Sequence, residues 1–166
     1  QMKARQPISV TNKDMTRFMM SLNDSVDLVL YALANGKNGE IYVRKSPAAT
    51  VGDTAQALVE LFNHKKGIIN IGIRPGEKMH ETLISPEELR RASDAGDYYS
   101  ISPELPKIDS REYFFKGENR ATNIPIEGYT SANTVRLAVK EIKKLLLSLP
   151  EIKKELGLLR RGNFYK

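Results

Sequence analysis

The sequence predicts an α/β fold in which a few short, partly parallel strands are flanked by helices. Three observations support this fold class. The 166 residues are 40% hydrophobic and 28% charged, which suits a globular domain with its own core. Short apolar runs alternate along the chain with segments of helical period. Each of the first two helical segments begins at a capping residue and closes in a turn rich in Asn and Gly.

The first strand and helix are predicted in the opening quarter of the chain. Residues 7–11 form a short apolar strand, and residues 12–14 form a polar loop. Ser21 followed by Asp24 has the spacing of a capping box, so a helix is expected to begin there. Residues 35–39, Asn-Gly-Lys-Asn-Gly, end it as a turn. The apolar positions lie on one helical face: Leu22, Val26, Val29, Leu30 and Leu33.

The same order then recurs. Residues 40–44 are a predicted strand, and Thr50 with Asp53 caps a second helix that residues 63–67 close. Residues 68–73 are nearly all apolar, which predicts a third strand buried on both faces. Strand, helix, strand, helix, strand predicts parallel strands joined by crossover helices. The apolar face of the second helix comprises Val51, Ala55, Leu58, Val59 and Phe62.

The remaining chain is less regular. Ser85-Pro86 begins a short helix, and residues 94–130 show no period apart from a possible strand at 98–101. A final helix is expected from about Val139 until Pro150 interrupts it, with a short continuation over residues 151–156. Its inward positions are Ile142, Leu145, Leu146 and Leu149. The predicted parts are an α/β core (1–93), an irregular excursion or arm (94–134), a helical segment (135–160) and a tail (161–166).

Composition excludes several kinds of site. There is no Cys, so disulfides, zinc–thiolate sites and thiol nucleophiles are absent. His64 and His80 have no close His partner, so we expect structural or surface roles for them and no metal site. No run of about 18 apolar residues occurs, so no transmembrane helix is expected. Residues 1–5 lack the apolar core of a signal peptide, and a cytoplasmic location is expected.

The net charge of +6 is concentrated in residues 136–166. A basic tail can bind nucleic acid or an anionic membrane. A solvated helix face with a loose end is the favoured interpretation, because no nucleic-acid-binding motif accompanies the charge. We therefore expect no nucleic-acid partner.

The sharpest local signal is the run from Arg74 to Lys78, directly after the third predicted strand. Ligands of open α/β sheets bind outside the carboxyl ends of strands, and an Arg there suits a phosphate. The Pro-Gly turn would let Glu77 fold back beside it and face ligand hydroxyls such as those of a ribose. A plain turn with solvated charges is the alternative, and the residues alone do not decide between them.

Arg17 follows the first strand and is expected in a strand-to-helix loop, where it could converge with Arg74 on one diphosphate. The alternative is an ion pair between Arg17 and Asp14 or Asp24.

Six segments together resemble one family. The most specific is residues 73–85, Ile-Arg-Pro-Gly-Glu-Lys-Met-His-Glu-Thr-Leu-Ile-Ser. The others are residues 8–20, 27–32, 39–43, 45–50 and 128–134. These segments resemble the C-terminal half of bacterial UDP-N-acetylglucosamine 4,6-dehydratases and related C4-epimerases, which are extended short-chain dehydrogenases/reductases of surface polysaccharide synthesis. The resemblance covers most of residues 7–156.

The resemblance implies roles for five residues. Arg17 and Arg74 would hold the diphosphate of a UDP-sugar. Glu77 would bind ribose hydroxyls, and the backbone around Val10 and Thr11 would lie near the uracil. These implied roles agree with the chemistry expected of Arg17, Arg74 and Glu77 from their residue types and positions.

The same resemblance implies that half of an enzyme is missing. The family's first half carries a Gly-rich turn for the dinucleotide and a Tyr-x-x-x-Lys pair, and neither pattern occurs in this sequence. NADP or NAD would therefore bind mainly to that Rossmann half, supplied in cis or as a separate chain. The complete enzyme is expected to be an NADP-dependent 4,6-dehydratase acting on UDP-N-acetylglucosamine, and to form a dimer or hexamer. The alternatives are a C4-epimerase or a truncated binding or assembly module without catalysis. This chain alone is expected to be inactive.

Overall fold

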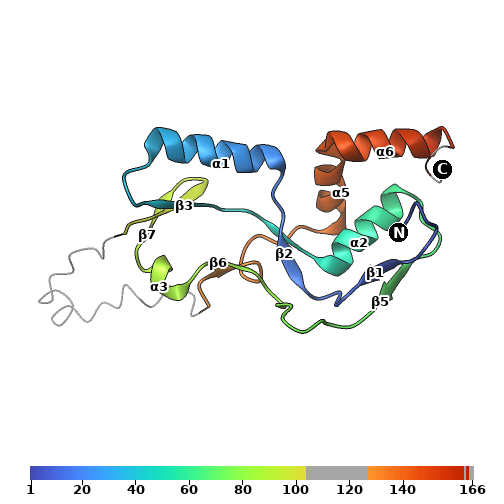
Figure 1. Ribbon diagram of the computed structural model, residues 1–166, viewed down its shortest axis with the longest axis horizontal. Helices are drawn as coiled ribbons and strands as arrows, with labels where there is room; N and C mark the ends of the chain where they lie inside the picture. Colours follow the sequence, from blue (N-terminus) through green and yellow to red (C-terminus); the bar gives the residue numbers. More distant parts are fainter. Residues whose placement is uncertain (104–126, 163, 165–166) are drawn as a thin grey trace, which may run out of the picture. The chain divides into compact units, whose positions relative to one another are not determined.

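The computed structural model describes residues 1–103, 127–162 and 164 (Figure 1). The chain divides into two compact units that share the sequence in alternating segments. The first unit comprises Gln1–Met19, Pro47–Glu81 and Val135–Lys166, and the second comprises Met20–Ser46 and Thr82–Thr134. The boundaries expected from the sequence after residues 93, 134 and 160 stay a prediction. Residues 104–126 of the expected arm and 163, 165 and 166 of the expected tail lie outside the described residues.

Two small sheets belong to the first unit. β1 (Ile8–Val10) pairs in parallel with β5 (Ile68–Asn70), and β2 (Thr16–Phe18) pairs antiparallel with β4 (Ala48–Thr50). The β1–β5 pair confirms that part of the fold is parallel. β2 and β4 were not expected, because their pairing joins residues far apart in the chain, such as Thr16 and Thr50, and no local pattern encodes it.

Helices α2 (Val51–Leu61) and α5 (Val139–Ser148) supply the core of the first unit and lie side by side (Figure 1). Its buried centre consists of Ala49, Ala57, Ile142 and Leu146. The cap predicted for α2 is present, since the Thr50 side chain accepts a hydrogen bond from the Asp53 N–H at 2.8 Å. α6 (Pro150–Arg160) begins at the predicted break and runs farther than expected. Leu145 and Leu149, also expected to face inward, are half-buried.

The second unit contains an antiparallel sheet in the order β3 (Ile41–Arg44), β8 (Tyr98–Ile101), β7 (Ala92–Ala95). The possible strand at 98–101 is thus confirmed. A second antiparallel pair joins β6 (Thr82–Ile84) to β9 (Tyr129–Thr130), and α3 (Pro86–Leu89) follows β6.

α1 (Leu22–Asn35) also belongs to the second unit, and it begins at the predicted capping box. Hydrogen bonds from Ser21 are the main reason that the pKa of the Asp24 carboxyl lies below its usual value, and the Arg44 guanidinium 2.9 Å away adds to the effect.

The expectation of three parallel strands joined in sequence is wrong. β3 pairs antiparallel with β8 rather than in parallel with β1 or β5. The order of the elements indicates that the strands exist, but the partner of β3 comes from much later in the chain.

The expectation that residues 68–73 form a strand buried on both faces is also wrong. β5 ends at Asn70, and Ile69, Ile71 and Ile73 are 46%, 48% and 50% exposed. β5 has one paired neighbour in a two-stranded sheet, so its apolar side chains are not enclosed on both faces. Among the described helices, none is both long and apolar enough to cross a lipid bilayer.

Candidate functional site

The candidate site lies at the carboxyl ends of β1 and β5. Because these strands are parallel, Val10 is paired with Asn70, and the Ile71 N–H donates a hydrogen bond to the Val10 carbonyl at 2.8 Å. The segments that begin at Thr11 and at Ile71 therefore leave the same edge of the sheet. This edge is where open α/β sheets place their ligands.

The turn that carries Arg74 is closed by two reciprocal hydrogen bonds. The Arg74 N–H donates to the Glu77 carboxylate at 3.0 Å, and the Glu77 N–H donates to the Arg74 carbonyl at 3.1 Å. Gly76 has φ of 85°, a left-handed conformation that favours Gly. The predicted fold-back of Glu77 is thus confirmed. The exposed Arg74 guanidinium makes no hydrogen bond or ion pair with any residue that the structure describes.

Arg17 lies in β2, not in the strand-to-helix loop that the sequence predicts. Its guanidinium is held against the segment that follows the Arg74 turn. Nη1 donates to the Thr16 carbonyl at 2.7 Å, Nη2 donates to the Lys78 carbonyl at 3.1 Å, and Nε lies 3.5 Å from the Glu81 carboxylate. Asp24, one of the two expected alternative partners of Arg17, pairs with Arg44 instead.

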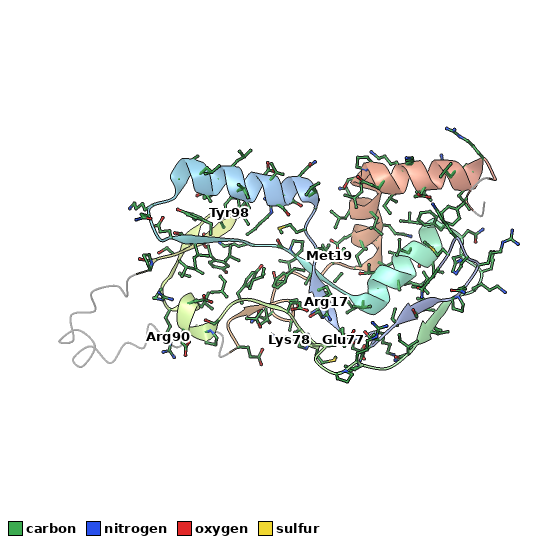
Figure 2. The ribbon with its side chains drawn as sticks, in the orientation of Figure 1. Arg17, Met19, Glu77, Lys78, Arg90 and Tyr98 are labelled. Atoms are coloured by element: carbon green, nitrogen blue, oxygen red, sulfur yellow. The ribbon has the colours of Figure 1, made fainter. Side chains whose placement is uncertain are left out.

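Thr16 and His80 anchor the same segment to β2. The Thr16 hydroxyl lies 2.8 Å from His80 Nδ1, and the Thr16 N–H donates to the Met79 carbonyl at 2.9 Å. Thr16 is buried. Figure 2 shows Arg17 near Lys78 and Glu77 where β2 passes this segment. Residues 78–81 thus form a bridge between β2 and the Arg74 turn.

Thr16, His80 and Glu81 also belong to the site, although the sequence pattern did not indicate them. The signal that could have found them is their position: each is one residue from a predicted site residue or within four residues of Glu77. His64 has the structural role expected of it, since it is buried and its Nε2 lies 2.9 Å from the Gln6 carbonyl. In the described part of the chain, no three His, Asp or Glu side chains gather as metal ligands would.

The structure therefore places the five predicted residues in two groups on the first unit. Val10, Thr11, Arg74 and Glu77 belong to the edge where β1 and β5 end, and Arg17 is attached through residues 78–81. Arg17, Arg74 and Lys78 bring three positive charges, against which Glu77 and Glu81 bring two negative charges. An anion with hydroxyl groups, such as a nucleoside diphosphate, matches this chemistry.

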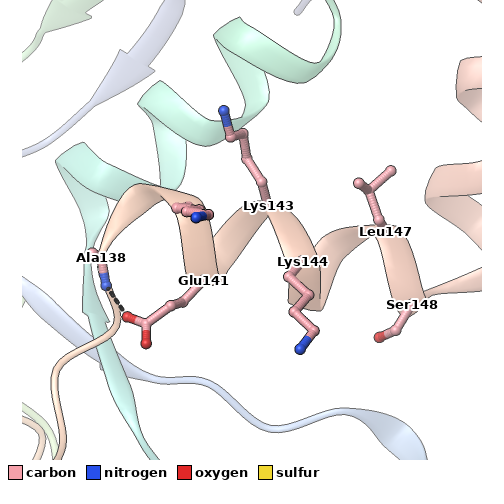
Figure 3. Close-up of a pocket in the computed structure, with 7 residues that line it drawn as sticks. Ala138, Glu141, Lys143, Lys144, Leu147 and Ser148 are labelled. Atoms are coloured by element: carbon pink, nitrogen blue, oxygen red, sulfur yellow. Dashed lines mark hydrogen bonds between the residues drawn. The ribbon is translucent and has the colours of Figure 1, made fainter.

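An open hollow lies on the surface of α5 (Figure 3). Within it the Ala138 N–H donates to the Glu141 carboxylate at 2.8 Å and the Glu141 N–H donates to the Ala138 carbonyl at 2.9 Å, while Lys143 is paired with Glu60. These contacts cap and brace a helix, so the strand-end site is the better candidate. The hollow is lined by Ala138, Lys140, Glu141, Lys143, Lys144, Leu147 and Ser148.

The fold is α/β, and a segment with three positive charges follows the carboxyl ends of β1 and β5 or contacts the residues that do. Residues 1–103 match the family model described as polysaccharide biosynthesis protein, and residues 109–153 match a model described as the C-terminal part of such proteins. The chain therefore belongs to the polysaccharide biosynthesis protein family. These matches agree with the C-terminal half of an extended short-chain dehydrogenase/reductase of the epimerase or dehydratase type.

Curated relatives are more than 40% identical in sequence to this chain over the aligned residues. UDP-glucose 4-epimerase of Rickettsia akari is 47% identical over 156 residues, and that of Rickettsia prowazekii is 46% identical over the same length. Both alignments cover 94% of this chain and 45% of the relative, so the chain spans about half the length of the curated relatives it matches.

A solved structure, the X-ray structure of Pen from Bacillus thuringiensis, has a TM-score of 0.71 and 30% identity. The alignment covers 89% of this chain and 42% of the chain in that structure. The α/β fold class is thereby confirmed.

Proposed function

We propose that this chain is the UDP-sugar-binding C-terminal part of a nucleotide-sugar epimerase. The observation that carries the proposal is Arg74. Its guanidinium has no partner among the described residues, and it lies four residues after the parallel strand β5, in a turn fixed by Glu77. Such a group can donate two parallel hydrogen bonds to a phosphate. The fixed turn sets the backbone position of Arg74 before the ligand arrives, which lowers the entropy cost of binding.

In this proposal the other site residues each contact a different part of the nucleotide. Arg17 adds positive charge beside the diphosphate, and the backbone at Val10 and Thr11 lies near the uracil. Glu77 binds ribose hydroxyls with the carboxylate oxygen that the Arg74 N–H does not use. The family match and the shared strand edge of Val10, Thr11 and Arg74 support this assignment.

The reaction proposed for the complete enzyme is inversion at C4 of a UDP-hexose. The names of the Rickettsia relatives favour epimerisation over the 4,6-dehydration of UDP-N-acetylglucosamine, which stays the second candidate on the resemblance of residues 73–85. The family description supports a role in bacterial surface polysaccharide synthesis.

The nicotinamide cofactor, NADP or NAD, is proposed to bind the half of the relatives that this chain does not match. The residues present do not fit a dinucleotide, because the sequence has neither the Gly-rich turn nor a Tyr-x-x-x-Lys pair. The cofactor would carry the hydride, while this chain would orient the UDP and exclude water. The chain alone is proposed to be inactive, and cytoplasmic location and homo-oligomer formation remain part of the proposal.

Calorimetric titration with UDP tests the site. We expect UDP to bind the wild-type chain and Arg74→Ala to weaken binding by roughly 10- to 100-fold, since a charge-assisted hydrogen bond contributes about 1.5–3 kcal/mol. The matched control is Lys66→Ala, which removes the same charge from the segment that precedes β5 at its opposite end. This control should keep the wild-type affinity.

Equal losses in Arg74→Ala and Lys66→Ala would mean that UDP responds only to net charge, and the assignment of Arg74 would be wrong. A folded wild-type chain that does not bind UDP would contradict the proposal that this part holds the nucleotide by itself.

A further inference from the structure

Helix α1 carries an apolar stripe that nothing in the described structure covers. Leu22 and Leu33 are 80% and 78% exposed, Val29 and Leu30 are both 58% exposed, and Val26 is 49% exposed. At about 100° per residue, Leu22, Val26, Val29 and Leu33 fall within about 60° of one another around the helix axis, and Leu30 borders them. We call these five residues the α1 stripe.

The opposite side of α1 already has its partner. Tyr31 lies about 170° around the axis from the centre of the stripe. Its ring stacks on that of Tyr98 in β8, with centroids 4.1 Å apart, and meets the ring of Tyr42 in β3 edge-on at 5.5 Å. Asp24, on the same side, pairs with Arg44 of β3. The sheet of the second unit therefore holds α1 by one face and leaves the stripe on the other.

The stripe is not an ordinary solvent face. It carries no charge over three turns of a well-capped helix, whereas Asp27, off the stripe, is charged and exposed. Contiguous apolar patches of this kind mark interaction surfaces. Complete burial of five such side chains removes roughly 300–500 Å² from water. That is less than the ~800 Å² per partner of a stable complex between separate proteins, so the stripe suits one part of a larger interface.

We propose that the α1 stripe is the surface on which the dinucleotide-binding half docks. The chain covers 45% of its curated relatives' length, so a body of comparable size exists in those proteins beside the matched part. A docked half would place the cofactor beside the sugar nucleotide that this chain is proposed to bind. It would also make contacts with this chain beyond the stripe. This inference rests on the proposed function, because it takes the unmatched half as the cofactor-binding part.

The test uses the unmatched half of the Rickettsia akari relative, made as a separate polypeptide and titrated with this chain in sedimentation experiments. A one-to-one complex is expected, and Leu33→Glu or Val29→Glu should weaken it at least roughly ten-fold, because a charge would be buried without a partner. The matched control is Ala34→Glu, which places the same charge one residue along the helix but off the stripe. It should leave the affinity within about three-fold.

Three results would overturn the proposal. They are the absence of a complex with the wild-type chain, equal effects of Leu33→Glu and Ala34→Glu, and a stripe-dependent complex that forms only between copies of this chain. UDP titration keeps the two proposals apart. Leu33→Glu should bind UDP as the wild type does. A wild-type chain that forms the complex but does not bind UDP would refute the proposed function and leave the docking surface standing.

Discussion

The guanidinium of Arg17 is already engaged by the protein's own backbone. Its nitrogen atoms contact the Thr16 and Lys78 carbonyls and the Glu81 carboxylate, whereas the Arg74 guanidinium makes no such contact within residues 1–103 and 127–162. Arg17 and Arg74, which the sequence predicts to be equivalent phosphate ligands, therefore differ in the contacts of their guanidinium groups. Arg17 fixes the bridge at residues 78–81, and Arg74 is available to a ligand.

This difference predicts different behaviour on substitution. Arg17→Lys should lower the free energy of unfolding by about 1–2 kcal/mol and weaken UDP binding as well, because an ammonium group cannot reproduce the planar contacts to two carbonyls. Urea denaturation and UDP titration of the same samples would measure both effects. In Arg74→Ala only UDP binding should change. A stable Arg17→Lys chain with normal UDP affinity would show that Arg17 matters for neither.

At the scale of elements, Gly128 sits where β9 begins. It has φ of 76°, and a Cβ there would clash with the Ile84 carbonyl and the backbone of Ser85 and Pro86. Gly128→Ala should therefore destabilise the chain by more than the ~1 kcal/mol that a left-handed conformation costs.

Gly96→Ala is the control for this prediction, since Gly96 has φ of 75° but open space around its Cα. Thermal unfolding should show a clearly larger loss for Gly128→Ala. Equal losses would mean that β6 and β9 move apart readily.

Helix starts were predictable from the sequence, and strand partners were not. Ser21 with Asp24 and Thr50 with Asp53 define their helices through bonds made within four residues. The partner of β3 depends on Tyr98–Ile101, far along the chain, and no local pattern encodes it. In the site, too, local contacts were predictable and long-range contacts were not. Arg74 and Glu77 meet within one turn, whereas the contacts of Arg17 with Lys78 and Glu81 join distant parts of the chain.

At the scale of the whole molecule, each of the two units has buried residues of its own. Ile142 is fully buried against α2 in the first unit, and Ile101 is buried in the sheet of the second. Ile142→Ala should cost about 2–5 kcal/mol of cavity and transfer free energy. Hydrogen exchange should accelerate in α2 and α5 more than in β8.

Leu147→Ala, on the same helix but 40% exposed, is the control and should cost clearly less than Ile142→Ala. Equal acceleration of exchange in α5 and β8 would show that the chain opens as one cooperative body rather than by units.

The chain passes from one unit to the other four times, after Met19, Ser46, Glu81 and Thr134. This path has a consequence for synthesis on the ribosome. α2 emerges with the side chain of Ala57 uncovered, and Ile142 and Leu146, which close its core, follow only after residues 82–138 have been made. The first unit therefore cannot complete its core until α5 has been made, and premature termination before α5 would release a chain without that core.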